Sequence, residues 1–72
     1  MSKEKAEFII YIINEIANAR GKTTSSVYKV LKKTGCIGSY LEAYYDVLHT
    51  MSSSSVVDDV LKFVEMEGEE LW

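Results

Sequence analysis

Several residue types are rare or missing in this chain, and each absence removes a class of protein. The 72 residues contain no proline, one histidine and one cysteine. Cys36 therefore has no partner for an internal disulfide. One histidine with one cysteine falls short of a four-ligand structural zinc site unless carboxylates or a second subunit contribute. Of the usual reinforcements for so small a core, oligomerisation is the plausible one that remains.

A long hydrophobic run is also missing. The apolar stretch from Phe8 to Ile13 is short and is flanked by lysine, glutamate and asparagine. A membrane-spanning helix needs about 20 apolar residues, and the charged flanks do not fit the apolar segment of a secretory signal. We expect a cytoplasmic protein with no membrane contact, and a lone cysteine fits that reducing compartment.

The charged residues are unevenly distributed along the chain, whose net charge is -3. Residues 1–36 hold seven of the eight basic side chains and three acids, whereas residues 37–72 hold one base, Lys62, and eight acids. The front half of the chain is therefore basic and the back half acidic. This charge separation favours head-to-tail self-contact or a charged partner. The alternative is attraction between the two halves within one fold. The hydrophobic fraction of 47% is typical of a globular chain and not of a disordered one.

Glycines and short polar segments divide the chain into helical pieces within one domain, residues 1–72. Helices are predicted at about 3–20, 24–34, 39–50 and 55–67, followed by a tail at 68–72. No segment has the length and alternation of a strand. The predicted fold is therefore all-α, a compact bundle of four helices of unequal length with no β-sheet.

The starts of the third and fourth predicted helices carry the same capping pattern. Ser39 precedes Glu42 by three residues, and Ser55 precedes Asp58 by three, the spacing of a capping box. Each serine is followed by apolar residues at i, i+3, i+4 and i+7, which predicts one buried helical face. These positions are Leu41, Tyr44, Tyr45 and Leu48 in the third helix, and Val57, Val60, Leu61 and Val64 in the fourth.

The first predicted helix carries an apolar arc that covers about half of its circumference, wider than the ~100° stripe of a helix packed on one core. It is therefore central in the fold or contributes half of a dimer interface. We expect a homodimer or a protein partner to contact Phe8, Tyr11 and Ile12. Trp72 is added to this surface, because an aromatic residue at a chain end docks back on the body or reaches a partner.

Residues 16–34 resemble the helix-turn-helix of bacterial repressors, with Ile-Ala before the turn glycine, a threonine cap and Val-x-Lys-Val. In that motif the second helix enters the DNA major groove. The contacts would come from Lys22, Ser25, Lys29 and Lys33. Lys22 stands where the motif usually has an apolar residue, the preceding helix is too long, and the chain is acidic. A solvated lysine face is the alternative.

Two further sets of residues carry side chains that take part in metal binding or catalysis in other proteins. Glu42, Asp46 and His49 are spaced i, i+4, i+7 and line one helix edge, where they would bind a divalent cation or act in acid–base chemistry. The alternative is a solvated edge. Cys36 would need His49 as its base to act as a nucleophile, and the alternative is a small buried hydrophobe. Neither set forms a catalytic motif, so we expect no enzymatic activity, no metal and no cofactor.

The segment Y-Y-D-V-L-H-T, followed by V-D-D-V at 57–60, resembles a family of short bacterial proteins known as domain-of-unknown-function family 3791. The most specific positions are Tyr45, Asp46, Leu48, His49 and Thr50. The resemblance covers Phe8 to Gly68 and implies a compact, all-helical, cytosolic bacterial protein. It also implies an accessory or antitoxin-like role, because such proteins often lie beside a gene for a toxin-like ADP-ribosyltransferase domain. It implies no catalytic residue.

The sequence therefore predicts a non-enzymatic protein-binding module that is a bacterial accessory or antitoxin-like partner of another protein. A small helix-turn-helix-like DNA-binding regulator that uses residues 16–34 is the alternative.

Overall fold

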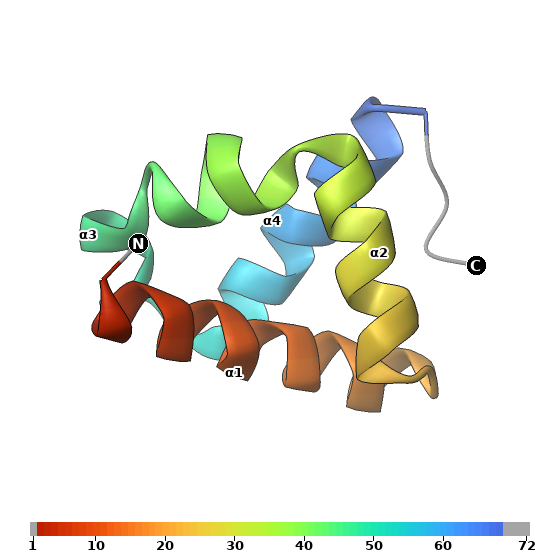
Figure 1. Cartoon of the computed structure of the whole chain (residues 1–72), viewed down its shortest axis with the longest axis horizontal. Helices are drawn as coiled ribbons and strands as arrows, with labels where there is room; N and C mark the ends of the chain where they lie inside the picture. Colours follow the sequence, from red (N-terminus) through yellow and green to blue (C-terminus); the bar gives the residue numbers. More distant parts are fainter. Residues whose placement is uncertain (1, 69–72) are drawn as a thin grey trace.

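Every regular element in residues 2–68, the part of the chain that the computed structural model describes, is a helix (Figure 1). The elements are α1 (Lys3–Arg20), α2 (Thr24–Thr34), the π-helix η1 (Ile37–Glu42), α3 (Tyr45–Leu48) and α4 (Ser53–Met66). The predicted all-α class is confirmed. The predicted four-helix bundle is not, because the third helix is replaced by η1 and α3, which have six and four residues.

The ends of α1 and α2 are fixed by local signals and agree with the predicted bounds. Ser2 Oγ accepts the Lys5 N–H at 3.2 Å at the start of α1. Gly21 and Gly35 end the two helices with φ of 63° and 78°, left-handed values that favour glycine. The N–H of each glycine bonds back to a carbonyl in the last turn, which satisfies a backbone group that the helix end leaves free.

The predicted capping box of Ser39 and Glu42 is wrong, because the chain is already helical before it reaches Ser39. After the left-handed Gly35, Cys36 has φ of -60° and ψ of -35°, a right-handed helical conformation. The Ser39 N–H donates to the Gly35 carbonyl at 2.9 Å, so it has no need of a cap. The helical path breaks at Tyr44, whose φ of -109° and ψ of 20° separate η1 from α3.

The predicted cap of the fourth helix is also wrong by three residues. Ser52, not Ser55, is the N-cap, and its Oγ accepts the Ser55 N–H at 3.3 Å. Any of the four consecutive serines has the side chain for this role. The face of α4 that is buried also differs from the predicted face. Val56 is fully buried while the predicted Val57 is only partly so.

The core lies between α1, the α2–η1 arm and α4. In Figure 1, α1 runs along one edge, α2 rises from its end, η1 and α3 return along the opposite edge, and α4 crosses behind them. α1 contributes five of the buried residues, α4 three, α2 two, and η1 and α3 one each, with Cys36 just before η1. The buried residues are Ile9, Ile12, Ile13, Ile16, Ala17, Val27, Leu31, Cys36, Leu41, Leu48, Val56, Val60 and Val64.

The packing corrects one detail of the predicted faces and agrees with one of the two explanations given for the wide arc of α1. Tyr44 was placed on the buried face of the third helix, yet its side chain is 56% exposed, because the break at this residue turns it away from Leu41 and Leu48. The wide arc of α1 is explained by contacts with α2, η1 and α4, which makes α1 the central helix. Within residues 2–68, no helix combines the length and the hydropathy needed to cross a membrane.

Candidate functional site

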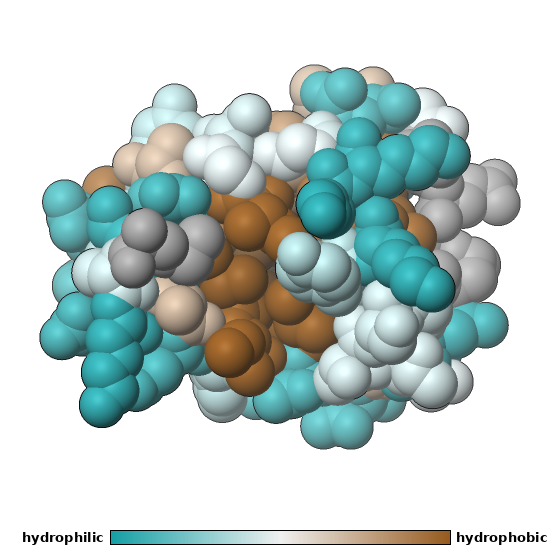
Figure 2. Space-filling view, in the orientation of Figure 1, coloured by the Kyte–Doolittle hydropathy of each residue, from teal (hydrophilic) through white to brown (hydrophobic). Residues whose placement is uncertain are grey.

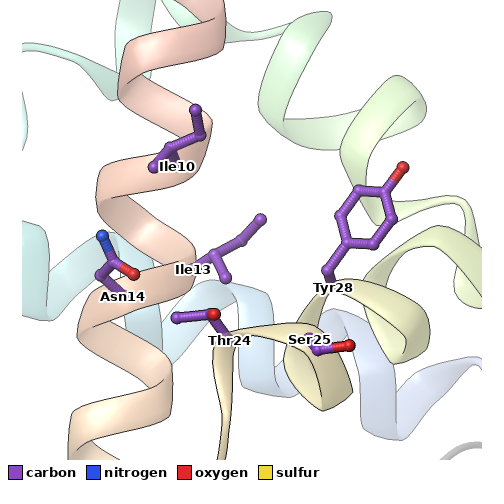
Figure 3. Close-up of a pocket in the computed structure, with 6 residues that line it drawn as sticks. All are labelled: Ile10, Ile13, Asn14, Thr24, Ser25 and Tyr28. Carbon is purple, nitrogen blue, oxygen red and sulfur yellow. The ribbon is translucent and has the colours of Figure 1, made fainter.

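An open groove runs between α1 and α2. Ile10, Ile13 and Asn14 line it from α1, and it has a volume of about 280 Å³. Thr24, Ser25 and Tyr28 line it from α2 (Figure 3). Figure 2 shows apolar side chains gathered in the centre of one face, in the area that Figure 1 shows between α1, α2 and η1, with polar residues around them. We call this feature the α1–α2 groove.

The groove has a buried floor and exposed apolar walls. Ile13 is 6% exposed and belongs to the core, whereas Ile10 is 58% and Tyr28 45% exposed. Tyr11, the next residue on α1, is 50% exposed. Single apolar residues at a protein surface are common, but Ile10 and Tyr28 are exposed on neighbouring helices around one hollow, and apolar surface gathered in this way marks interaction sites.

The two walls of the groove differ in charge. Between Thr24 and Thr34, α2 carries three lysines and no acidic residue. Lys32 Nζ lies 5.9 Å from the centroid of the Tyr28 ring, so one of these charges stands beside the apolar wall. On α1 there is no charged residue from Phe8 to Asn14. The residues that line the groove are uncharged, but Lys32 stands beside them on the α2 side, so we call that side the basic wall and the α1 side the neutral wall.

The predicted partner residues fall in three different environments. Phe8 is partly buried, and its ring meets the ring of Tyr45 edge-on with centroids 5.4 Å apart. Tyr11 is exposed on α1 but is not among the residues that line the groove. Ile12 is fully buried on the inner side of α1, so its assignment to a contact surface is wrong: in this fold it reaches only the core. Trp72 lies outside the described residues.

The predicted DNA contacts are all on the surface. Lys22 precedes α2, and Ser25, Lys29 and Lys33 are exposed on it while Val27 and Leu31 enter the core. Ser25 also lines the α1–α2 groove. This arrangement is the solvated lysine face of an amphipathic helix, and it leaves the same side chains accessible to a phosphate backbone.

The acidic edge near His49 does not become a metal site. Within residues 2–68, no group of three or more histidine, cysteine, aspartate or glutamate side chains is placed to hold a metal ion. Asp46 and His49 are both exposed, and the His49 ring meets the Tyr45 ring edge-on at 4.7 Å between centroids.

The other family-like positions serve α3 itself. Leu48 is buried in the core, and Tyr45 packs between Phe8 and His49. Thr50 Oγ1 donates to the Val47 carbonyl at 2.7 Å and so closes the end of the helix. The motif therefore has a structural explanation at most of its positions.

Cys36 has the environment of a core residue. Its side chain has no exposed surface, and burial raises the pKa of the thiol to about 12. A thiol of that pKa stays protonated at neutral pH, so it supplies no thiolate nucleophile. This agrees with the interpretation of Cys36 as a small buried hydrophobe.

One polar contact between η1 and α4 has no signal in the sequence. The Tyr40 hydroxyl donates to Asp59 Oδ2 at 3.2 Å, and the Tyr40 ring stacks on Phe63 with centroids 5.9 Å apart. Burial, and after it the negative charge of Asp59, raise the pKa of Tyr40 to about 12. Because the two residues are 19 positions apart on different helices, no local spacing signals their contact.

Comparison with known proteins gives a family and no closer relative. A family model described as "Protein of unknown function (DUF3791)" matches residues 7–67, which is most of the chain. No curated protein and no solved structure matches it.

Proposed function

The chain belongs to the DUF3791 family, and on that premise we propose that it is a non-enzymatic protein-binding module, a cytoplasmic accessory or antitoxin-like partner of another bacterial protein. The observation that supports this function is the α1–α2 groove, whose walls expose Ile10 and Tyr28. Both side chains remain in water in the isolated chain, and burying them against a partner would be favourable.

The dimensions of the groove favour a protein over a small molecule as its ligand. Its volume of about 280 Å³ lies below the ~300–1,000 Å³ of pockets that enclose drug-sized ligands. Its polar residues are one asparagine, one threonine and one serine, with no charged group among the lining residues. A shallow apolar hollow of this kind accepts a few side chains from a partner surface.

The second part of the proposal is a homodimer. Tyr44, Val47 and Met51, which lie in and beside α3, are 56%, 60% and 38% exposed and form the candidate patch. This patch is separate in sequence from the α1–α2 groove, so a dimer formed through it would not use the residues that line the groove. A chain that is monomeric at tens of micromolar by light scattering after size exclusion would contradict the dimer.

Co-expression with the product of the adjacent gene tests the protein-binding function. We expect the two proteins to co-purify, and we expect Ile10→Gln to weaken the complex at least about tenfold, because it replaces an exposed apolar wall with a polar one. Met66→Gln is the matched control, since Met66 is 86% exposed on α4 outside the groove. Co-purification that is absent, or equally strong in both variants, contradicts the proposal.

DNA binding by α2 is the second candidate function, and the observation that favours it is a helix with three lysines and no acid. It predicts duplex binding at low salt that falls steeply as salt rises, with loss of affinity in Lys29→Glu. A chain that binds no duplex DNA at low salt does not have this function.

A further inference from the structure

We propose that the occupant of the α1–α2 groove is one amphipathic helix of a second protein, with carboxylates along the edge that faces α2. The inference rests on the proposed function and adds the shape and charge of the partner surface.

The walls of the groove favour a helix over other peptide conformations. Adding a strand to this protein requires an exposed sheet edge, and residues 2–68 contain no strand. Recognition of polyproline segments uses grooves lined by aromatic residues, and Tyr28 is the single aromatic residue among the lining side chains. A helix presents apolar side chains at i, i+3 and i+4, which suits the floor at Ile13 between the walls at Ile10 and Tyr28.

The basic wall selects acidic residues on one edge of that helix. Ser25, Tyr28 and Lys32 are spaced i, i+3, i+7 and therefore share one stripe of α2. Ser25 and Tyr28 line the groove, and Lys32 Nζ is held 5.9 Å from the Tyr28 ring centroid. A helix seated against Tyr28 thus brings its flank to the Lys32 ammonium, and Lys29 lies one turn from Ser25 on the same side.

The α1 wall of the groove does not favour a charged residue on the partner helix. From Phe8 to Asn14 the helix α1 has only apolar and neutral residues. The nearest acid toward the N-terminus, Glu7, is within 4.0 Å of Lys3 Nζ in an exposed ion pair. The partner edge along α1 is therefore apolar or small and polar, with the Asn14 amide as a hydrogen-bonding group. This asymmetry fixes the rotation of the partner helix about its own axis.

A second copy of the chain is a poor occupant. A symmetric contact through the groove would place two basic α2 walls against each other, which is unfavourable. The acidic helix of the chain, α4, already buries its apolar face in the core of its own chain through Val56, Val60 and Val64. Its exposed side carries Asp58, Lys62 and Glu65, which do not fill an apolar groove.

Two model peptides test the inference directly. Both are helices of about 18 residues, long enough to be helical in water, with the same leucine stripe; one carries glutamates along one flank and the other carries lysines. We expect the full chain to bind the glutamate peptide at least about fivefold more tightly at low salt, the size of one exposed ion pair. The preference should shrink as salt is added. Amide shifts should change at Ile10, Asn14, Ser25 and Tyr28.

Charge-reversal variants separate the groove from the overall charge. Lys32→Glu should abolish or reverse the preference, whereas Lys62→Glu, the same change on α4, should leave it. Ile10→Gln should weaken both peptides by the same factor. Equal affinity for the two peptides, no binding of either, or an unchanged preference in Lys32→Glu overturns the inference, as do groove shifts that appear on concentrating the chain alone.

The two proposals fail in different ways. If the complex with the adjacent-gene product depends on Ile10 but not on Lys32 or Lys29, the protein-binding function stands and the acidic helix is wrong. If that complex does not depend on Ile10, the proposed function itself is wrong, whatever the peptides do.

Discussion

The Tyr40 hydroxyl donates a hydrogen bond to Asp59 Oδ2 at 3.2 Å and so joins η1 to α4. The ring of Tyr40 lies nearly parallel to that of Phe63, at an angle of 27°. One side chain therefore ties the irregular π-helix to the regular helix behind it through both a polar and an apolar contact. The irregular segment gains its position from α4 and not from its own hydrogen bonding alone.

Removing this hydrogen bond should lower the free energy of unfolding by about 1 kcal/mol, the usual net value of such a bond. Tyr40→Phe keeps the stacked ring and removes only the hydroxyl. In a double-mutant cycle with Asp59→Ala, the two losses should overlap instead of adding. Urea unfolding followed by circular dichroism measures each value. Tyr44→Phe, which takes a hydroxyl from an exposed ring nearby, is the control and should change little; strict additivity in the cycle would refute the coupling.

Alkaline pH should destabilise the fold between about pH 9 and 12. Burial raises the pKa of Cys36 from 9.0 to about 12, and burial with the charge of Asp59 raises that of Tyr40 from 10.0 to about 12. Well below pH 9 both groups are protonated in the folded and unfolded states. As the pH rises, the unfolded chain loses these protons first, so stability falls by up to about 1.4 kcal/mol per pH unit for each group.

Urea midpoints at several pH values between 8 and 12 measure this loss. Cys36→Ala should remove the part of the slope that begins near pH 9, and Tyr40→Phe the part that begins near pH 10. If both variants keep the slope of the parent chain, the titration of other groups is responsible.

Two isoleucines on α1 should respond in opposite ways to truncation. Ile12 has no exposed surface, so Ile12→Ala should cost ~2–5 kcal/mol, comparable with the whole ~3–5 kcal/mol that a core of this size supplies. Ile10 is 58% exposed, and Ile10→Ala should be neutral or slightly stabilising because alanine has the higher helix propensity. Thermal unfolding by circular dichroism compares them. An Ile12→Ala variant that unfolds at the same temperature as the parent chain would disagree with this core.

The serine run before α4 offers a test of which residue caps the helix. Ser52→Ala should cost about 1 kcal/mol, because it removes the acceptor of the Ser55 N–H. Ser55→Ala, which lies inside the helix, should stay within about 0.5 kcal/mol of the parent. The same urea measurement ranks the two, and a larger loss in Ser55→Ala would restore the cap expected from the sequence.

The helix ends that the sequence predicts correctly are those whose signals are local. Gly21 and Gly35 adopt left-handed conformations that glycine tolerates well, and the helices end at the residues before them. Ser39 fails because a capping box needs a residue outside the helix. The turn at Gly35 is one residue long, so the chain returns to a helical conformation at Cys36. The S-x-x-E spacing of Ser39 and Glu42 does not indicate this early return.

The sequence predicts that α1 has several neighbours but does not predict which of its residues line the groove. The wide apolar arc of α1 correctly indicated more than one neighbour. It did not show that Ile12 faces inward while Ile10 faces the groove, because that depends on where α2, η1 and α4 stand around the helix. Tyr28 enters the site only through the crossing of α2 against α1, which the sequence of α2 alone does not specify.

The single-residue turn at Gly35 also makes this corner intolerant of changes in chain length. An insertion between Gly35 and Cys36 would rotate the following helical residues by roughly a quarter of a turn. Leu41, fully buried now, would swing off the core, and Tyr40 would lose its alignment with Asp59. Length variation among relatives should therefore collect in the serine run before α4 and be absent here.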